Sequence, residues 1–224
     1  MSSLLKRFFQ IYTRSFEGLS KEIWMLSLVM LINRSGAMVI PFMTIYLNTE
    51  LNISLKECAL IMSCFGMGSV CGSFLGGVLT DKVGFFKVMY LSLLTSSICF
   101  VAMKEMKTFW PLCIGIFVLA IIYELFRPAN LTAIEAYSKK ENLTRSLGLV
   151  RLAVNLGYAV GPFMGGYVAS KLGYDFLFIF NGIALFTGGT VFFLLFKNKK
   201  HRATTAPISK KEKAALQMLS LIHI

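Results

Sequence analysis

Six long apolar stretches dominate the chain, at residues 23–47, 58–80, 86–103, 110–135, 147–170 and 175–196. A helix needs about 20 residues to cross the ~30 Å hydrocarbon core of a bilayer, and each stretch reaches or approaches that length. Charged residues make up only 15% of the 224 residues and apolar ones 56%, whereas about a quarter of a soluble domain is charged. We therefore predict an all-α integral membrane protein with six transmembrane helices, which we number as spans 1 to 6.

Basic residues predict the orientation of the spans. Of the 23 Lys and Arg residues, sixteen lie before span 1, between spans 2 and 3, between spans 4 and 5 or after span 6, and only four lie in the other loops. Because cytoplasmic loops carry the excess of positive charge, both ends of the chain are expected in the cytoplasm of a cell (inner or plasma) membrane. Positive charge at the ends of apolar stretches is typical of membrane topology, so no nucleic-acid partner is expected.

The two ends of the chain are less apolar than the spans. Residues 1–22 place Leu5, Phe8, Phe9, Tyr12 and Phe16 at near-helical spacing between basic residues, which is typical of an amphipathic helix on the cytoplasmic leaflet. A leader that only supplies positive charge fits the same residues. Residues 197–224 start as a basic polar segment and then become apolar again. We interpret them as a cytoplasmic linker, truncated before a second six-helix half.

Glycine recurs at every fourth residue in spans 2 and 5, at Gly68, Gly72 and Gly76 and at Gly157, Gly161 and Gly165. This spacing lets a neighbouring helix approach to backbone contact, so simple helix packing explains either stripe alone. Their presence in the second and fifth spans, together with Pro41 in span 1 and Pro128 in span 4, also pairs spans 1–3 with spans 4–6. Three spans are an odd number, so the second unit enters from the opposite side. We predict a 3+3 inverted repeat, an architecture of transporters.

Two motifs resemble signatures of a known family. After span 2 the sequence reads Gly77-Val-Leu-Thr-Asp81-Lys82-Val-Gly84-Phe-Phe-Lys87, and in span 5 it reads Gly157-Tyr-Ala-Val-Gly161-Pro162-Phe-Met-Gly165-Gly166. The first resembles the loop 2–3 signature of the major facilitator superfamily, and the second resembles the span 5 signature of its proton-coupled drug antiporters. The resemblance covers about residues 23–200. It implies a chain equivalent to the N-terminal half of a twelve-span transporter.

The resemblance implies a gating role for the loop 2–3 motif. Asp81 would dock on a helix N-terminus of the missing C-terminal half and hold the outward-open state, since helix N-termini stabilise negative charge. Local balance of Asp81 by Lys82 and Lys87 is the alternative. Phe85 and Phe86 stand where the family has a basic pair, so the charges at this cytoplasmic gate differ in detail.

Local backbone chemistry predicts three further features. Ser54 and Glu57 have the spacing of a capping box, which places the start of span 2 between them. Gly84 permits a tight turn between spans 2 and 3. Pro162 removes a backbone hydrogen bond from span 5 and is expected to bend it; the family resemblance implies that this bent, tightly packed span limits proton leak.

Polar and charged side chains lie at one depth in spans 1, 4 and 5: Asn33, Arg34, Glu124, Arg127 and Asn155. An ionised side chain at mid-bilayer costs at least ~2.5–3.5 kcal/mol and marks a functional site by default. We predict that these residues line a cavity for protons and substrate, with Glu124 as the protonatable carboxylate. Arg34 and Arg127 would either favour its charged form or receive an anionic substrate. A static ion pair of Glu124 with Arg34 or with Arg127 is the structural alternative.

These features favour a secondary transporter, specifically proton-coupled efflux of small amphipathic molecules by alternating access. A six-helix channel, or a structural membrane protein without transport activity of its own, is the alternative. No enzyme, cofactor or metal is expected, because both histidines (His201 and His223) lie in the polar tail and the cysteines lack metal-ligand spacing. The expected partners are the lipid bilayer, protons, a small-molecule substrate and the missing C-terminal half, on which substrate choice also depends.

Overall fold

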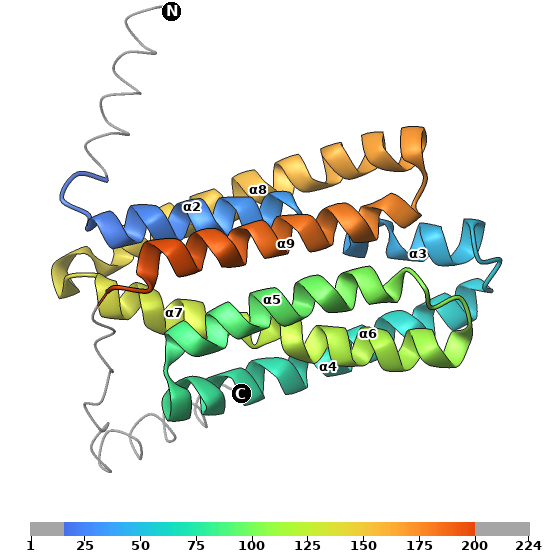
Figure 1. Ribbon diagram of the computed structural model, residues 1–224, viewed down its shortest axis with the longest axis horizontal. Helices are drawn as coiled ribbons and strands as arrows, with labels where there is room; N and C mark the ends of the chain where they lie inside the picture. Colours follow the sequence, from blue (N-terminus) through green and yellow to red (C-terminus); the bar gives the residue numbers. More distant parts are fainter. Residues whose placement is uncertain (1–15, 200–224) are drawn as a thin grey trace, which may run out of the picture.

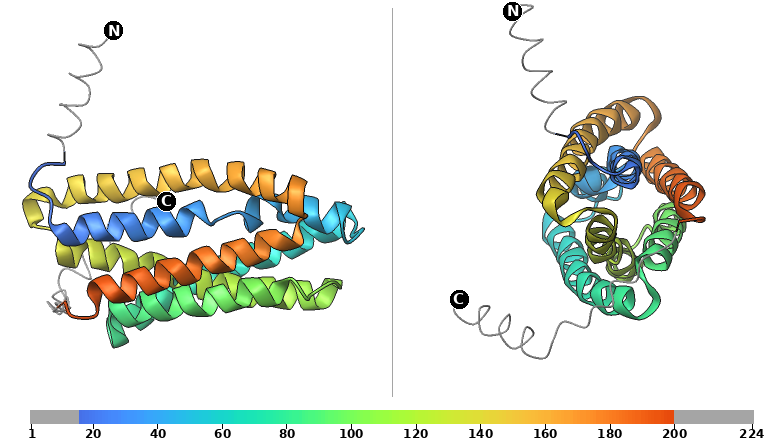
Figure 2. Two further views of the ribbon diagram at one scale, coloured as in Figure 1. Left: turned by 45° about the horizontal axis from the view of Figure 1, so that its top comes forward. Right: turned by 90° about the vertical axis from the view of Figure 1, so that its left-hand side faces the viewer.

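The computed structural model describes residues 16–199, which form a bundle of helices with roughly aligned axes (Figure 1 and Figure 2). Most of the predicted leader and linker therefore lies outside the described residues. Every regular element between residues 16 and 199 is helical: α2 Lys21–Ser35, α3 Val39–Thr49, α4 Leu55–Val83, α5 Phe85–Met103, α6 Phe109–Glu124, α7 Phe126–Tyr137, η1 Lys140–Asn142, α8 Leu143–Leu172 and α9 Asp175–Phe196. They make 6 candidate membrane spans, because α2 with α3 and α6 with α7 each form one crossing. The predicted all-α fold with six spans is confirmed.

Several helices extend a few residues beyond the apolar stretches, because polar residues complete their end turns. At the start of α4, Ser54 Oγ accepts the N–H of Glu57 (3.4 Å) and Glu57 Oε2 accepts the N–H of Ser54 (3.2 Å), which is the expected capping box. At its end, Gly84 connects α4 to α5 with a φ of +88°, a value that other residues rarely adopt. A single residue therefore reverses the chain between spans 2 and 3.

Spans 1 and 4 are interrupted near their middle, which the continuous apolar stretches did not predict. Residues 36–38 separate α2 from α3, and Leu125 separates α6 from α7. Pro41 and Pro128 each occupy the third position of the second helix. Proline has no N–H for the carbonyl four residues earlier and its ring crowds that carbonyl, so the preceding turn cannot continue as a regular helix. The two prolines account for the two interruptions.

The helices pack most extensively in three pairs, α4 with α6, α2 with α8 and α5 with α9, the last of which lie side by side in Figure 1. The glycine stripes lie inside the first two pairs. A Cβ atom at Gly72 would strike the backbone of Ile121 in α6, and one at Gly157 would lie 2.5 Å from the Cβ of Arg34 in α2. Glycine is required at these positions because the neighbouring helix fills the space of a side chain.

Features of spans 1–3 recur in spans 4–6 at a spacing of 89 residues, the separation of Arg34 and Tyr123. Gly84 and Gly173 end spans 2 and 5 with φ values of +88° and +97°, and each donates its N–H to the carbonyl four residues earlier. The glycine stripes and the helix interruptions follow the same spacing. If spans 1–3 and spans 4–6 exchange places, the α4–α6 contact corresponds to the α8–α2 contact, and the α5–α9 contact corresponds to itself. This is the pattern expected of the predicted inverted repeat.

Candidate functional site

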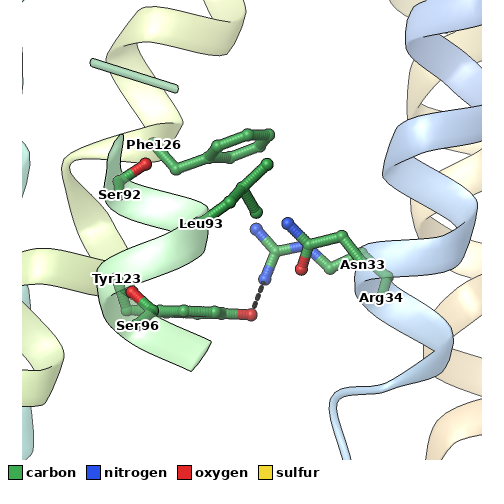
Figure 3. A pocket seen from close by; sticks show the side chains of 7 residues that line it. All are labelled: Asn33, Arg34, Ser92, Leu93, Ser96, Tyr123 and Phe126. Atoms are coloured by element: carbon green, nitrogen blue, oxygen red, sulfur yellow. Dashed lines mark hydrogen bonds between the residues drawn. The ribbon is translucent and has the colours of Figure 1, made fainter. Parts of the chain in front are cut away.

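Arg34, in the last turn of α2, joins spans 1, 4 and 5 where span 1 is interrupted. Its Nη1 atom donates hydrogen bonds to the hydroxyl oxygens of Tyr123 in α6 (2.6 Å, dashed in Figure 3) and Tyr158 in α8 (3.0 Å). The guanidinium carbon lies 5.4 and 5.3 Å from the two ring centroids, within the range of cation–π attraction. Two tyrosines therefore hold this arginine through both their hydroxyl groups and their rings.

A narrow pocket lies beside the guanidinium, with no room for a water molecule. Its walls come from spans 1, 3 and 4 (Figure 3): Asn33, Arg34, Ser92, Leu93, Ser96, Tyr123 and Phe126. Three buried atoms of this pocket have no hydrogen-bond partner among residues 16–199: Arg34 Nε, Asn33 Oδ1 and Ser96 Oγ. Because such a group costs ~1–3 kcal/mol when it stays unpaired, the pocket is suited to a polar partner.

The predicted ion pairs of Glu124 are not formed within residues 16–199. Glu124 is half-buried at the end of α6 and interacts electrostatically with Arg34 and Tyr123, but neither Arg34 nor Arg127 lies within 4.0 Å of its carboxylate. The interruption at Leu125 separates Glu124 from Arg127, which is exposed, as is Asn155. The hydroxyl groups of Tyr123 and Tyr158 lie beside Arg34, where the alternative of a static ion pair placed the carboxylate of Glu124.

Four side chains of this cluster were not predicted: Ser92, Ser96, Tyr123 and Tyr158. Serine and tyrosine occur in apolar helices as ordinary packing residues, so composition does not single them out. The available signal was the spacing between the two three-span units, which matches the position of Arg34 in span 1 to that of Tyr123 in span 4.

The span 5 motif packs against the interruption in span 1. Its buried glycines face α2 and α3: Gly157, Gly161 and Gly165. A Cβ atom on Gly161 would lie 3.1 Å from the carbonyl oxygen of Arg34, whereas one on Gly166 would lie 3.7 Å from the ring of Phe42. The α8 helix continues through Pro162 to its end at Leu172. The motif thus fixes the backbone that carries Arg34.

The loop 2–3 motif lies at the junction of α4 and α5. Gly77 is half-buried in α4 and Gly84 forms the turn. The charged side chains of the motif are exposed and form no ion pair within the described part of the chain: Asp81, Lys82 and Lys87. The alternative role of Asp81, in which Lys82 and Lys87 balance its charge locally, is therefore not seen in the structure.

Asn181, a buried residue of α9 that the sequence did not single out, holds the interrupted region of span 1. Its Oδ1 atom accepts hydrogen bonds from the backbone N–H groups of Met38 (3.1 Å) and Val39 (3.4 Å). The first N–H groups of any helix lack acceptors within that helix. Asn181 supplies an acceptor at the start of α3 and so stabilises the break between α2 and α3.

A charged cluster connects the other ends of spans 1 and 6. Lys107 Nζ, in the loop between spans 3 and 4, donates to Tyr46 Oη and Asp175 Oδ1, both at 2.9 Å. Burial lowers the pKa of Lys107, but the two hydrogen bonds and the electrostatic attraction of Tyr46 and Asp175 together outweigh burial and raise that pKa above 10.5. The ammonium group therefore keeps its proton throughout the neutral range.

Comparison with known proteins connects this architecture to a family. A family model described as Major Facilitator Superfamily matches residues 23–223. The chain is 25% identical over 175 residues to the uncharacterized MFS-type transporter YqjV of Bacillus subtilis, covering 78% of this chain and 42% of that protein. It is 27% identical over 139 residues to the multi-drug resistance efflux pump PmrA homolog of Lactococcus lactis (60% and 34%). It is 22% identical over 203 residues to the quinolone resistance protein NorA of Staphylococcus aureus (90% and 52%).

Solved structures show the same fold. A crystal structure of the peptide transporter POT in complex with alafosfalin superposes with a TM-score of 0.74 at 20% identity, over 92% of this chain and 46% of that one. A bacterial homologue of human drug peptide transporters gives a TM-score of 0.71 at 19% identity, over 90% and 48%. The chain thus spans about half the length, or less, of the relatives it matches. It is a multi-pass membrane protein, and it belongs to the major facilitator superfamily.

Proposed function

We propose that the protein containing this chain is a secondary transporter that exports small amphipathic molecules, coupled to protons, by alternating access. The observation that carries the proposal is the cluster around Arg34, in which spans 1, 4 and 5 meet where two of them are interrupted. Membership of a transporter family supports it, and so do relatives named as efflux and drug resistance proteins. Irregular backbone in mid-membrane is typical of transporter binding sites.

Glu124 is the proposed proton carrier. It is the last residue of α6, where the helix dipole opposes negative charge, whereas the electrostatic interaction with Arg34 favours it. A movement of span 4 relative to span 1 would change this electrostatic interaction. Proton binding would in this way be linked to the arrangement of spans 1 and 4, with Asn33, Arg127 and Asn155 as further groups of the cavity.

The proposed mechanism is rocking of two six-span halves, of which this chain is one, about a site in mid-membrane. The matching interruptions, glycine stripes and positive-φ glycines of spans 1–3 and 4–6 support an inverted repeat within this half. Alternating access in such proteins consists largely of rocking one repeat or bundle against another around a fixed site. We further propose that both ends of the chain are cytoplasmic, in a cell (inner or plasma) membrane, and that the exposed Asp81 docks on a C-terminal half.

The proposed role of Glu124 is tested in the full-length protein. Inverted membrane vesicles take up a panel of cationic, neutral and anionic amphipathic dyes, with and without an imposed proton gradient. We expect Glu124→Gln to lower gradient-driven uptake at least about tenfold, a typical loss for a positioned proton-transfer group. Glu141→Gln, an exposed acid in η1, is the control and should retain uptake.

Two outcomes would contradict the proposal. Unchanged gradient-driven uptake in Glu124→Gln would remove Glu124 from the proton pathway. Uptake by the wild-type protein that is independent of the proton gradient would favour the passive six-helix channel instead.

A further inference from the structure

The charge of Arg34 has no carboxylate beside it within residues 16–199. Its hydrogen-bond partners are two neutral phenols, and Glu124 acts on it only from beyond 4.0 Å. Charged side chains inside membrane proteins normally pair with one another or with backbone carbonyls, because an unpaired charge is costly there. The site is therefore suited to a negative group that reaches Arg34 from outside this cluster.

The free edge of the guanidinium has the shape that carboxylates bind. Both tyrosines use Nη1, Nε is buried without a partner, and Nη2 makes no hydrogen bond to a described residue. The Nε–H and one Nη2–H bond of an arginine point in parallel along one edge of its planar group, and the two oxygens of a carboxylate match that edge. The tyrosines thus hold Arg34 and leave its bidentate edge open.

Two more polar groups line the same pocket. Asn33 and Ser96 are only 2% and 1% exposed, and neither Asn33 Oδ1 nor Ser96 Oγ has a hydrogen-bond partner within residues 16–199. The Ser96 hydroxyl group and the side-chain NH₂ group of Asn33 can donate to an anion, whereas Asn33 Oδ1 can only accept a hydrogen bond from a donor group on the ligand. Leu93 and Phe126 form the apolar side of the pocket, opposite Arg34 in Figure 3. A ligand with one anionic end and an apolar body would match these walls.

We propose that the Nε–Nη2 edge of Arg34 binds a carboxylate of the transported substrate, so that the substrate class is small amphipathic anions. The inference rests on the transport activity proposed above, but not on the direction of transport. The pocket is too narrow for a water molecule in this structure, so a wall moves when the anion enters. Phe126 is the first residue after the interruption at Leu125, and we place this movement there.

Glu124 offers a second test of the proposal, because its substitution should change anion binding and transport in opposite directions. An ionised carboxylate near Arg34 repels an incoming anion, whereas a neutral carboxylic acid or an amide does not. Glu124→Gln should therefore strengthen anion binding, although the same substitution is expected to lower proton-driven transport at least about tenfold. A variant that loses transport but binds the anion more tightly would separate the role of Glu124 in proton transfer from its electrostatic effect on anion binding.

The test measures binding of 2-naphthoate and of its neutral isostere 2-naphthamide to the full-length protein in lipid nanodiscs by equilibrium dialysis. We expect naphthoate to bind at least about tenfold more tightly than naphthamide, as charge-assisted hydrogen bonds allow. Arg34→Gln should remove this preference. Arg34→Lys should keep part of it, because lysine retains the charge but lacks the two parallel N–H bonds of arginine. Glu124→Gln should bind naphthoate several-fold more tightly. Arg145→Gln, exposed at the start of α8, should change neither affinity.

Equal binding of the two probes overturns the proposal, and so does a preference that survives Arg34→Gln. The second result is expected if a carboxylate from another segment of the protein neutralises Arg34. Failure of the proposed function has a different outcome, namely Arg34-dependent binding of naphthoate without proton-driven flux. Arg34→Lys keeps the test open if Arg34→Gln does not fold.

Discussion

Arg34 can reach its tyrosines only because the residue beside it in α8 has no side chain. A Cβ atom on Gly157 would lie 2.5 Å from the Cβ of Arg34 and 2.9 Å from its carbonyl carbon. Both contacts are shorter than packed atoms tolerate, and one of them is with backbone, which cannot rotate away as a side chain can. The position of the guanidinium group therefore depends on a glycine in another span.

Gly157→Ala is expected to separate α2 from α8 and to shift Arg34. Overpacking of this kind typically costs ~1–3 kcal/mol, so we expect the full-length variant to have a lower Tm and reduced transport. Gly148→Ala is the matched control in the same helix, since a Cβ atom there meets nothing within 4 Å. Alanine is the better helix former by ~1 kcal/mol, so the control should unfold at the same or a higher temperature. Equal behaviour of the two variants would contradict the packing argument.

At the scale of elements, spans 1 and 4 are each built from two half-helices rather than one long helix. Proline at the third position of the second half-helix prevents continuation, and Asn181 of α9 accepts the free N–H groups at the start of α3. The polar cluster around Arg34 lies next to both interruptions. The same backbone feature therefore positions the polar groups and supplies the places where spans 1 and 4 can bend.

Pro128→Ala is expected to join α6 to α7 by restoring an N–H for the carbonyl of Glu124. Since proline inside a helix costs ~3 kcal/mol relative to alanine, the variant should be more stable, with a higher Tm. Its transport should be several-fold slower, because span 4 loses its point of bending. Pro111→Ala is the control: Pro111 is also third in its helix, but it lies at the true start of α6, where proline is tolerated. Unchanged transport in Pro128→Ala would show that span 4 does not bend there.

At the scale of the whole molecule, polar contacts join segments at both ends of the bundle. At one end, Ser20 Oγ donates to the carbonyl oxygen of Tyr137 (2.8 Å), and Lys199 pairs with Glu22 (2.7 Å). At the other end, Lys107 connects Tyr46 of span 1 to Asp175 of span 6. These contacts join spans 1–3 to spans 4–6 at both ends of the bundle.

Lys107→Met is expected to lower the free energy of unfolding by up to about 1 kcal/mol, because the ion pair with Asp175 is partly exposed. A pKa raised above 10.5 means that the folded state binds the proton more tightly. This stabilisation is therefore fully present below pH 10.5 and is lost as the pH rises through the folded-state pKa. Thermal unfolding of wild type and variant from pH 6 to pH 11 should show a constant gap in Tm that closes only at the alkaline end. Lys171→Met, which removes an exposed lysine, is the control and should leave the dependence of Tm on pH unchanged. A difference in Tm between wild type and Lys107→Met that widens as the pH rises would contradict stabilisation by the charged Lys107.

Length and composition were sufficient to predict the six spans. The conformational freedom of glycine predicted the tight turn at Gly84, and the four-residue spacing of glycine predicted the stripes that bring helices together. The partners of Arg34 were not predictable in the same way. Spans 4 and 5 are apolar on most of their surface, so periodicity does not show which side of each helix faces Arg34, and Tyr123 and Tyr158 resemble packing residues. The interruption at Leu125 then separated Glu124 from Arg127, a pair that an unbroken helix would have kept on one face.

The contact between Arg34 and Tyr123 has a consequence for how such a site could originate. If the two three-span units descend from one duplicated segment, these two positions, 89 residues apart, began as the same residue facing its own copy across a two-fold axis. Two arginines there would repel each other, and two tyrosines would carry no charge. Only divergence of the copies, to arginine in one and tyrosine in the other, gives an attractive contact with a cation left to bind something else. On that premise, the contact between Arg34 and Tyr123 is a departure from the symmetry of the two units.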